Sequence, residues 1–253
     1  MSLTRRNTKQ TIEREAFLQL LKQCYLGGAL AEATLRIEDG IGVMELIDIT
    51  NTITIHSSIK LAGEDVNCEL GLGDLDLIIK FLSSLEDEEL LFDIKKMGWM
   101  RLSTKKGNRS LSYLLSKTDL IVTNVEKDYR SMFKKLKKKM EEEIELEEGT
   151  IRDLLSYINM IKEKGLTLRM NEGILSIVYG NPNEHRFKVI LDKHFSGNDD
   201  FDIKLNGEFI AKILNVIEYE EGEKPLLAFA DSELPVMIKG KNTTYFITPI
   251  AED

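Results

Sequence analysis

A short helix that occurs twice, each time followed by the same kind of strands, most constrains the fold of this chain. Residues 72–85 read LGDLDLIIKFLSSL, and residues 205–218 read LNGEFIAKILNVIE. When the two segments are aligned, their apolar positions coincide and Lys80 falls on Lys212. Each helix is followed by apolar strands joined by a Lys- and Gly-containing turn. This agreement in order and pattern predicts an internal duplication.

The rest of the chain repeats the order helix, strands, helix, strands. Apolar residues at helical spacing predict helices over 13–26, 74–85, 150–163 and 207–218. Alternating or continuous apolar runs predict strands over 33–39, 42–48, 52–61, 89–96, 99–106, 109–116, 166–172, 174–180, 186–193, 224–232, 234–240 and 243–250. The sequence therefore predicts an α+β protein built from two similar domains.

Residues 117–148 interrupt this pattern. A cationic run, KKLKKK at 134–139, is followed by an acidic run, EEEIELEE at 141–148. We interpret most of this segment as a solvated charged linker, with a strand beginning before residue 148. The predicted organisation is an N-terminal domain at 1–118, a linker at 119–139 and a C-terminal domain at 140–253.

Composition bounds the classes of function. The 253 residues carry a net charge of −9, which argues weakly against a protein that coats nucleic acid but allows basic residues to gather on one inner surface. Two cysteines make neither a disulfide framework nor a zinc site. The start of the chain has no apolar signal-peptide core and no apolar run is long enough for a membrane span. We expect a cytoplasmic protein with no membrane partner.

Motifs for catalysis are not found in the sequence. The three histidines, His56, His185 and His194, lie in no metal-ligand spacing, and no phosphate-binding or nucleophile motif occurs. Carboxylates cluster in runs that fit solvated loops better than an acid/base pair. We expect no enzyme activity, no catalytic residue, no metal site and no cofactor.

The polar faces of the four helices hold the one informative pattern. Opposite each apolar stripe stand small polar residues and a few cations, an arrangement that an ordinary solvent face would also show. These residues are Asp76, Lys80 and Ser83; Glu208, Lys212 and Asn215; Arg152, Ser156 and Asn159; and Gln19 and Gln23 with Lys22 at the edge. The pattern gains meaning if all four helices line one surface.

With these features the chain resembles the DNA sliding clamps. The duplicated order carries the resemblance, together with LNGEFIAKILNVIE and the segment KPLLAFADSELPVMIKGKNTTYFITPIAED that follows it closely. The chain's end is similar to proliferating cell nuclear antigen, and RSLSYLLSKTDLIVTN is closer to clamps of T-even-type phages. The charged segment at 119–148 departs from the family. If the chain is phage-derived, the compartment would be the host cytoplasm.

The resemblance implies the clamp fold, with two helices on one face of antiparallel sheets in each domain. It also implies a homotrimeric ring around double-stranded DNA, which a clamp loader opens and which holds DNA polymerase for processive replication. Lys80, Arg152 and Lys212, with Lys22 a weaker candidate, would then contact phosphates without reading sequence. We expect residues 109–116 to pair with an edge strand of a neighbouring chain, with 174–180 as the first candidate.

A partner-peptide pocket is also implied by the resemblance. Its residues fall on Pro235, Phe246 and Pro249, covered by Leu120 and Val122 of the linker, with Ile47 and Ile53 as weaker candidates. Prolines and an aromatic residue beside alternating apolar residues suit a peptide anchor, although Phe246 could equally be core. The alternative function is a two-domain α+β adaptor that binds peptides and never binds DNA. Oligomeric state distinguishes the two.

Overall fold

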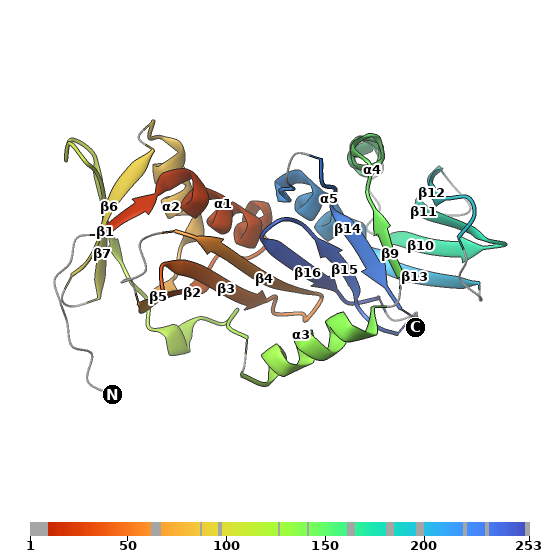
Figure 1. Cartoon of the computed structure of the whole chain (residues 1–253), viewed down its shortest axis with the longest axis horizontal. Helices are drawn as coiled ribbons and strands as arrows, with labels where there is room; N and C mark the ends of the chain where they lie inside the picture. Colours follow the sequence, from red (N-terminus) through yellow and green to blue (C-terminus); the bar gives the residue numbers. More distant parts are fainter. Residues whose placement is uncertain are drawn as a thin grey trace. The chain divides into compact units, whose positions relative to one another are not determined.

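The structure is a computed structural model of the chain (Figure 1). It describes residues 10–61, 67–86, 88–95, 98–125, 127–140, 142–160, 165–180, 185–195, 200–219, 222–230 and 233–250. The chain divides into two compact units. The first comprises Met1–Leu46 with His56–Asn124, and the second comprises Ile47–Ile55 with Val125–Asp253. Within the described residues, no helix is long and apolar enough to cross a membrane.

In its described residues, the first half of the chain contains two α-helices and eight strands. In chain order these are β1 (Gln10–Glu13), α1 (Arg14–Tyr25), β2 (Ala33–Glu38), β3 (Ile41–Ile47), β4 (Ile53–Lys60), β5 (Cys68–Leu72), α2 (Leu75–Ser83), β6 (Glu89–Lys95), β7 (Trp99–Thr104) and β8 (Ser110–Leu114). The strand neighbours run β1-β6-β7-β8 and β5-β2-β3-β4. Helices α1 and α2 lie against each other. A 3-10 turn follows α1 at Leu26–Gly28, and another follows β8 at Thr118–Leu120.

The second half repeats this order. Its elements are α3 (Lys127–Lys139), β9 (Glu142–Glu145), α4 (Glu148–Met160), β10 (Gly165–Asn171), β11 (Ile174–Gly180), β12 (Arg186–Asp192), β13 (Phe201–Asn206), α5 (Gly207–Val216), β14 (Leu226–Phe229), β15 (Val236–Lys239) and β16 (Thr243–Ile247). The strand neighbours run β9-β14-β15-β16 and β13-β10-β11-β12. Helices α4 and α5 lie against each other.

The predicted duplication is confirmed element by element. From β9 onward, each strand and helix of the second half has a counterpart at the same place in the order from β1 to β8, and the neighbour order of the strands is the same. Only α3 stands outside this correspondence among the described α-helices and strands. The α+β fold of two similar halves, with two helices each, is thus as predicted.

The second unit is layered, and the alternation of side chains along its strands shows how. Ala228, Met237 and Phe246 of β14, β15 and β16 pack with α3. Their neighbours Leu227 and Ile238 point to the other face, where α4, α5 and the sheet β13-β10-β11-β12 supply the remaining apolar side chains. The sheet β9-β14-β15-β16 therefore has α3 on one face and the main core of the unit on the other.

Several details differ from the sequence-based expectations. The segment 127–139, predicted as solvated linker, forms helix α3, while the strand predicted before residue 148 is present as β9. Strands β1 and β13 were not predicted. Leu77, placed on the apolar stripe of its helix, is 45% exposed, and Gln23, placed on a polar face, is fully buried. The hydroxyl of buried Ser57 donates a 3.3 Å hydrogen bond to the Gln23 side-chain oxygen, which explains how this amide is tolerated in the core.

Candidate nucleic-acid and partner interfaces

Lys80 and Lys212 occupy the same position on equivalent helices. Helix α2 begins after Asp74, whose carboxylate accepts a 3.0 Å hydrogen bond from the Leu77 N–H. Helix α5 begins after Asn206, whose side-chain oxygen accepts hydrogen bonds from the first backbone N–H groups of the helix. Each lysine follows its cap by the same number of residues. The caps therefore fix both lysines at the same turn of equivalent helices.

Each of these lysines is paired with an acid one turn earlier. The Lys80 ammonium lies 2.5 Å from the Asp76 carboxylate, and the Lys212 ammonium lies 2.7 Å from the Glu208 carboxylate. The hydrogen bond and charge of Asp76 raise the pKa of Lys80, and Lys80 in turn lowers the pKa of Asp76. Lys212 also lies over the ring of Phe209, 6.0 Å from its centroid. Each of the two lysines is thus paired with a carboxylate of its own helix.

The other two predicted DNA contacts lie on the helices that pack beside α2 and α5. Lys22 is half-buried on α1, and Arg152 is exposed on α4. Helix α1 is tied to α2 by the Tyr25 hydroxyl, which donates a 3.2 Å hydrogen bond to Asp76. Each half of the chain therefore places its two predicted cations on a pair of neighbouring helices (Figure 1).

These helix faces can support only weak binding of phosphates. Lys80 and Lys212 must exchange a carboxylate for a phosphate, so little charge is gained on binding. Lys80 is exposed and Lys212 is half-buried, and lysine–carboxylate pairs near the surface contribute little to stability, so the exchange would cost little as well. A lysine or arginine on a helix face contacts a phosphate without reading base sequence.

The partner-pocket residue Phe246 is covered by the chain's own helix α3. Its ring stacks on the ring of Phe133, with centroids 5.2 Å apart and planes at 21°. Phe133 and Leu136 of α3 are buried with Ala228, Met237 and Phe246 in one apolar cluster. Val125, Met140 and Leu234 pack against its margin. Phe246 is therefore core in this conformation, and any pocket at this position is filled.

The other predicted pocket residues are spread over both units. Leu120 and Val122 belong to the first unit, and each is 66% exposed. The segment that carries them is held there because the Val122 N–H donates a 2.6 Å hydrogen bond to the Glu32 carboxylate. In the second unit, Pro235, Pro249 and Ile47 are half-buried. Ile53 is fully buried, so its side chain belongs to the core and cannot contact a peptide in this conformation.

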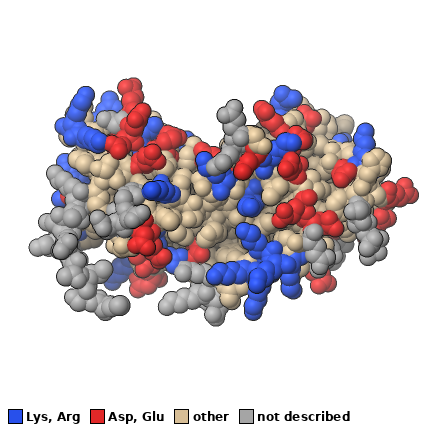
Figure 2. All heavy atoms as spheres, in the orientation of Figure 1, with Lys and Arg blue, Asp and Glu red and all other residues tan. Residues whose placement is uncertain are grey.

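Sequence reasoning missed Phe133 and Leu136. The signal was present, since Phe133, Leu136 and Met140 recur at the spacing of one helical face. The dense lysines around them, at 134, 135, 137, 138 and 139, led to the prediction of a solvated linker. Those five lysines are exposed, and positive charge gathers over α3 in Figure 2.

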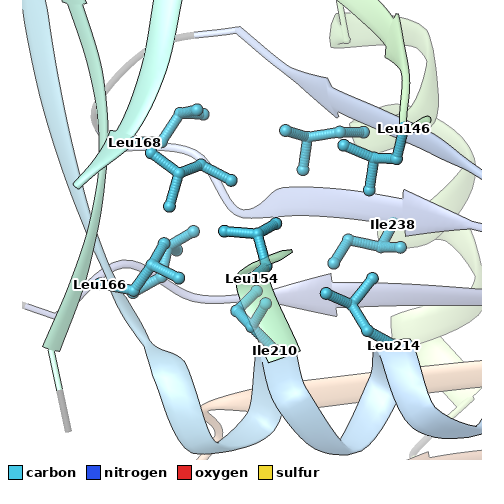
Figure 3. Close-up of a pocket in the computed structure, with 10 residues that line it drawn as sticks. Leu146, Leu154, Leu166, Leu168, Ile210, Leu214 and Ile238 are labelled. Atoms are coloured by element: carbon cyan, nitrogen blue, oxygen red, sulfur yellow. The ribbon is translucent and has the colours of Figure 1, made fainter. Parts of the chain in front are cut away.

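The described core of the second unit contains one small cavity (Figure 3). Its volume is about 10 Å³, which is at most the space of one water molecule. Ten apolar residues line it, among them Leu146, Leu154, Leu166, Leu168, Ile210, Leu214 and Ile238. A cavity of this size and lining holds no ligand, and we interpret it as imperfect packing between α4, α5 and the sheets.

One expectation about strand edges is wrong. Residues 174–180 form β11, which lies between β10 and β12 and has no free edge for a neighbouring chain. In that sheet the edges are β12 and β13. The other strand of the expected pair, β8, is an edge strand of β1-β6-β7-β8. The apolar run of β11 reflects burial between two strands rather than an interface.

In the part of the chain that the structure describes, no group of three or more His, Cys, Asp or Glu side chains is arranged to hold a metal. Cys24 is buried and Cys68 is half-buried, and both are free thiols. Burial raises the pKa of Cys68 to about 11, so this thiol is protonated and a poor nucleophile at neutral pH.

Solved structures of DNA sliding clamps match nearly the whole chain. The DNA polymerase sliding clamp of Pseudomonas aeruginosa matches with a TM-score of 0.74 and 14% identity, over 99% of this chain and 69% of its own. The PCNA of A. fulgidus, solved with the C-terminal region of FEN-1 bound, matches with a TM-score of 0.69 and 12% identity, over 97% and 99%. The beta clamp of Helicobacter pylori, bound to a DNA ligase peptide, matches with a TM-score of 0.71 and 12% identity, over 100% and 68%.

No protein-family model and no curated protein sequence matches the chain. At 12–14% identity, the structural matches show similarity of fold alone. They agree with the duplicated order of elements and with the paired helices of each half. The chain therefore has the fold of the DNA sliding clamps.

Proposed function

We propose that this chain is a sliding clamp: copies of it form a ring that encircles duplex DNA and tethers DNA polymerase for processive replication. The observation that carries the proposal is the clamp fold over nearly the whole chain, in two equivalent halves. A clamp acts by encircling the DNA and needs no catalytic group. Its partners would be duplex DNA, a polymerase, a clamp loader and further copies of itself.

The DNA contacts in this proposal are Lys80 and Lys212, with Arg152 and Lys22 on the neighbouring helices. Supporting them is the equivalent placement of Lys80 and Lys212, each after a helix cap and beside an acid. Weak phosphate contacts let a ring move along a duplex without dissociating. A net charge of −9 keeps the outside of such a ring from competing for DNA.

Three copies per ring follow from the two similar halves in each chain, if the ring has six such halves. We propose that β8 of one copy pairs with β12 of the next, because both are edge strands and pairing removes both free edges. Each carries an exposed aliphatic side chain, Leu114 on β8 and Ile190 on β12. In this arrangement β12 takes the place of the buried strand β11 as the partner of β8.

Partner proteins are proposed to bind the second unit at the apolar sheet face around Phe246, with the half-buried residues Pro235, Pro249 and Ile47 as further proposed contacts. Leu120 and Val122 remain proposed contacts because they are exposed aliphatic residues. The A. fulgidus PCNA and H. pylori beta clamp structures, each with a bound partner segment, support this class of interaction.

The alternative is a peptide-binding adaptor that does not bind DNA, which the exposed aliphatic residues and the apolar sheet face would equally serve. Light scattering on the purified chain separates the two functions. A clamp is expected to reach three times the chain mass of 28.9 kDa at high concentration. A particle that stays at one or two chain masses at every concentration argues for the adaptor.

A further inference from the structure

Helix α3 is the element that the duplication does not explain. Every other described α-helix and strand has a counterpart in the opposite half of the repeat. Among its described side chains, α3 packs on the sheet through Phe133 and Leu136. A helix added outside a duplicated scaffold, on a face where partners are proposed to bind, requires a role of its own.

The contacts of α3 resemble those of a bound amphipathic peptide. Phe133 and Leu136, one turn apart, are 9% and 8% exposed and pack on Ala228, Met237 and Phe246. The Phe133 ring stacks on the Phe246 ring, and Met140 lies partly buried one turn beyond Leu136. The remaining side chains from 134 to 139 are exposed lysines. We call the surface formed by Ala228, Met237 and Phe246 the Phe246 face.

We propose that α3 is a resident ligand of the partner site: the Phe246 face binds an amphipathic helix with an aromatic residue and, one turn later, an aliphatic residue, and a partner must displace α3 to bind. This inference rests on the proposed function for the identity of the partners. The chemistry of α3 itself defines what the face accepts, namely an aromatic ring to stack on Phe246 and an aliphatic side chain beside it.

Two features make α3 exchangeable rather than a permanent layer of the core. Its lysines stand three and four residues apart, as at 134 and 138 or 135 and 139, and like charges at these spacings disfavour the helix. None of these five lysines has an ion-pair partner among the described residues to offset the repulsion. Among the described side chains of the helix, Phe133 and Leu136 make its apolar contacts with the Phe246 face. Because α3 belongs to the same chain, it competes at a high effective concentration.

The test compares the unmodified protein with a Phe133→Ala/Leu136→Ala variant. The probe is a fluorescent synthetic peptide with the sequence of residues 127–140. In the unmodified protein α3 occupies the site in most molecules, and the apparent affinity for the peptide falls in proportion to the fraction of molecules whose site is open. The variant is therefore expected to bind the peptide at least about tenfold more tightly than the unmodified protein. A peptide carrying the same two alanines is expected not to bind either protein.

A Lys134→Ala/Lys138→Ala variant is the matched control, since it changes the same helix and leaves both anchors. It is expected to bind the peptide no more tightly than the unmodified protein does. Equal binding of the peptide by the anchor variant and the unmodified protein, with both folded by circular dichroism, overturns the inference.

If the anchor variant does not fold, hydrogen exchange on the unmodified protein decides. An excess of isotope-labelled peptide is expected to remove protection from the amides of α3 while β15 stays protected. No change in α3 overturns the inference. These assays contain no DNA, so they test the inference about α3 independently of the clamp proposal. Failure to form a ring on DNA would contradict the clamp proposal without changing the result for α3.

Discussion

At the scale of single residues, the helix-face lysines are neutralised cations rather than free ones. Lys80 and Lys212 each hold an acidic side chain from the preceding turn, and this pairing is the same in both halves. If these lysines contact DNA as proposed, a duplex would replace each carboxylate with a phosphate. Such contacts are weak individually and depend on salt.

Replacing both lysines tests this directly. Lys80→Ala/Lys212→Ala is expected to weaken duplex binding and to lower the slope of log affinity against log salt by up to about 1 for each phosphate that is no longer neutralised. The measurement is a salt titration of duplex binding for the variant and the unmodified protein. Lys224→Ala is the matched control, because Lys224 is also paired with acids, Glu145 and Glu147, but lies outside the four helices. An unchanged slope in the double variant would exclude these lysines as DNA contacts.

A second residue-scale prediction concerns Glu45 in the first half. Burial alone would raise the pKa of Glu45, but the hydrogen bond from His56 and the charge of Arg36 outweigh it and leave the pKa lowered. A carboxyl with a lowered folded-state pKa stabilises the fold above its unfolded pKa of about 4.3, and this stabilisation is lost as the pH falls through the folded pKa. Glu45→Gln is thus expected to lower the unfolding free energy at pH 7, by roughly 1–3 kcal/mol.

The difference between Glu45→Gln and the unmodified protein is expected to shrink as the pH falls below about 4. Denaturant unfolding at several pH values measures it. Glu69→Gln, a change at an exposed glutamate on β5, should show no comparable difference at any pH. A Glu45→Gln effect that stays constant down to the lowest pH would mean that the carboxylate charge is not its cause.

At the scale of elements, the strongly periodic segments were predictable and the charged one was not. The four repeated helices and the hairpins after α2 and α5 were predicted from their apolar periodicity, and the structure buries stripe residues such as Ile78 and Leu82 of α2 and Ile210 of α5. Helix α3 was missed because five lysines surround its apolar residues Phe133 and Leu136. Its burial depends on Ala228, Met237 and Phe246, which lie far away in the sequence.

The candidate site was predictable to a smaller degree. The equivalence of Lys80 and Lys212 follows from the aligned segments alone. The covering of Phe246 and the full burial of Ile53 could not be predicted from the sequence, because both depend on which strands become neighbours. The choice of β11 as an edge failed for the same reason, since a short apolar run reads alike in an edge strand and a central one.

Two substitutions on helix α4 separate an effect on the stability of the fold from an effect on duplex binding. Leu154→Ala removes a side chain that is 2% exposed and borders the existing cavity, so it should lower the unfolding free energy by about 2–5 kcal/mol. Arg152→Ala, at an exposed position on the same helix, should change it by less than about 0.5 kcal/mol and weaken duplex binding. Chemical unfolding and duplex titration of both variants measure this. A large loss of stability in Arg152→Ala would show that the residue supports the fold instead.

At the scale of the whole molecule, the two equivalent halves are the feature from which the proposed ring follows. The proposed ring needs strands that pair between copies and helices that face the DNA, and the duplication supplies two such helices in each half. The edge strands β8 and β12 are where the proposal depends on contacts between copies.

Leu114→Asp on β8 tests these contacts. Leu114 is 59% exposed, so a charge there should leave the single chain folded but shift the assembly from three chains towards one. Ile49→Asp is the matched control, because Ile49 is 81% exposed and outside the edge strands. Light scattering across a range of concentrations measures both variants. Loss of assembly in Ile49→Asp but not in Leu114→Asp would place the interface elsewhere.

The central claim is that the chain encircles DNA, and the dependence of binding on DNA ends tests it most directly. The protein is first allowed to thread onto linear duplex, both ends are then blocked with a bulky bound protein, and the salt concentration is raised. A ring should remain on the blocked duplex at salt that abolishes phosphate contacts, and it should leave when the duplex is cut. Release by salt at the same rate from blocked and from cut duplex would contradict the proposal that this chain is a sliding clamp.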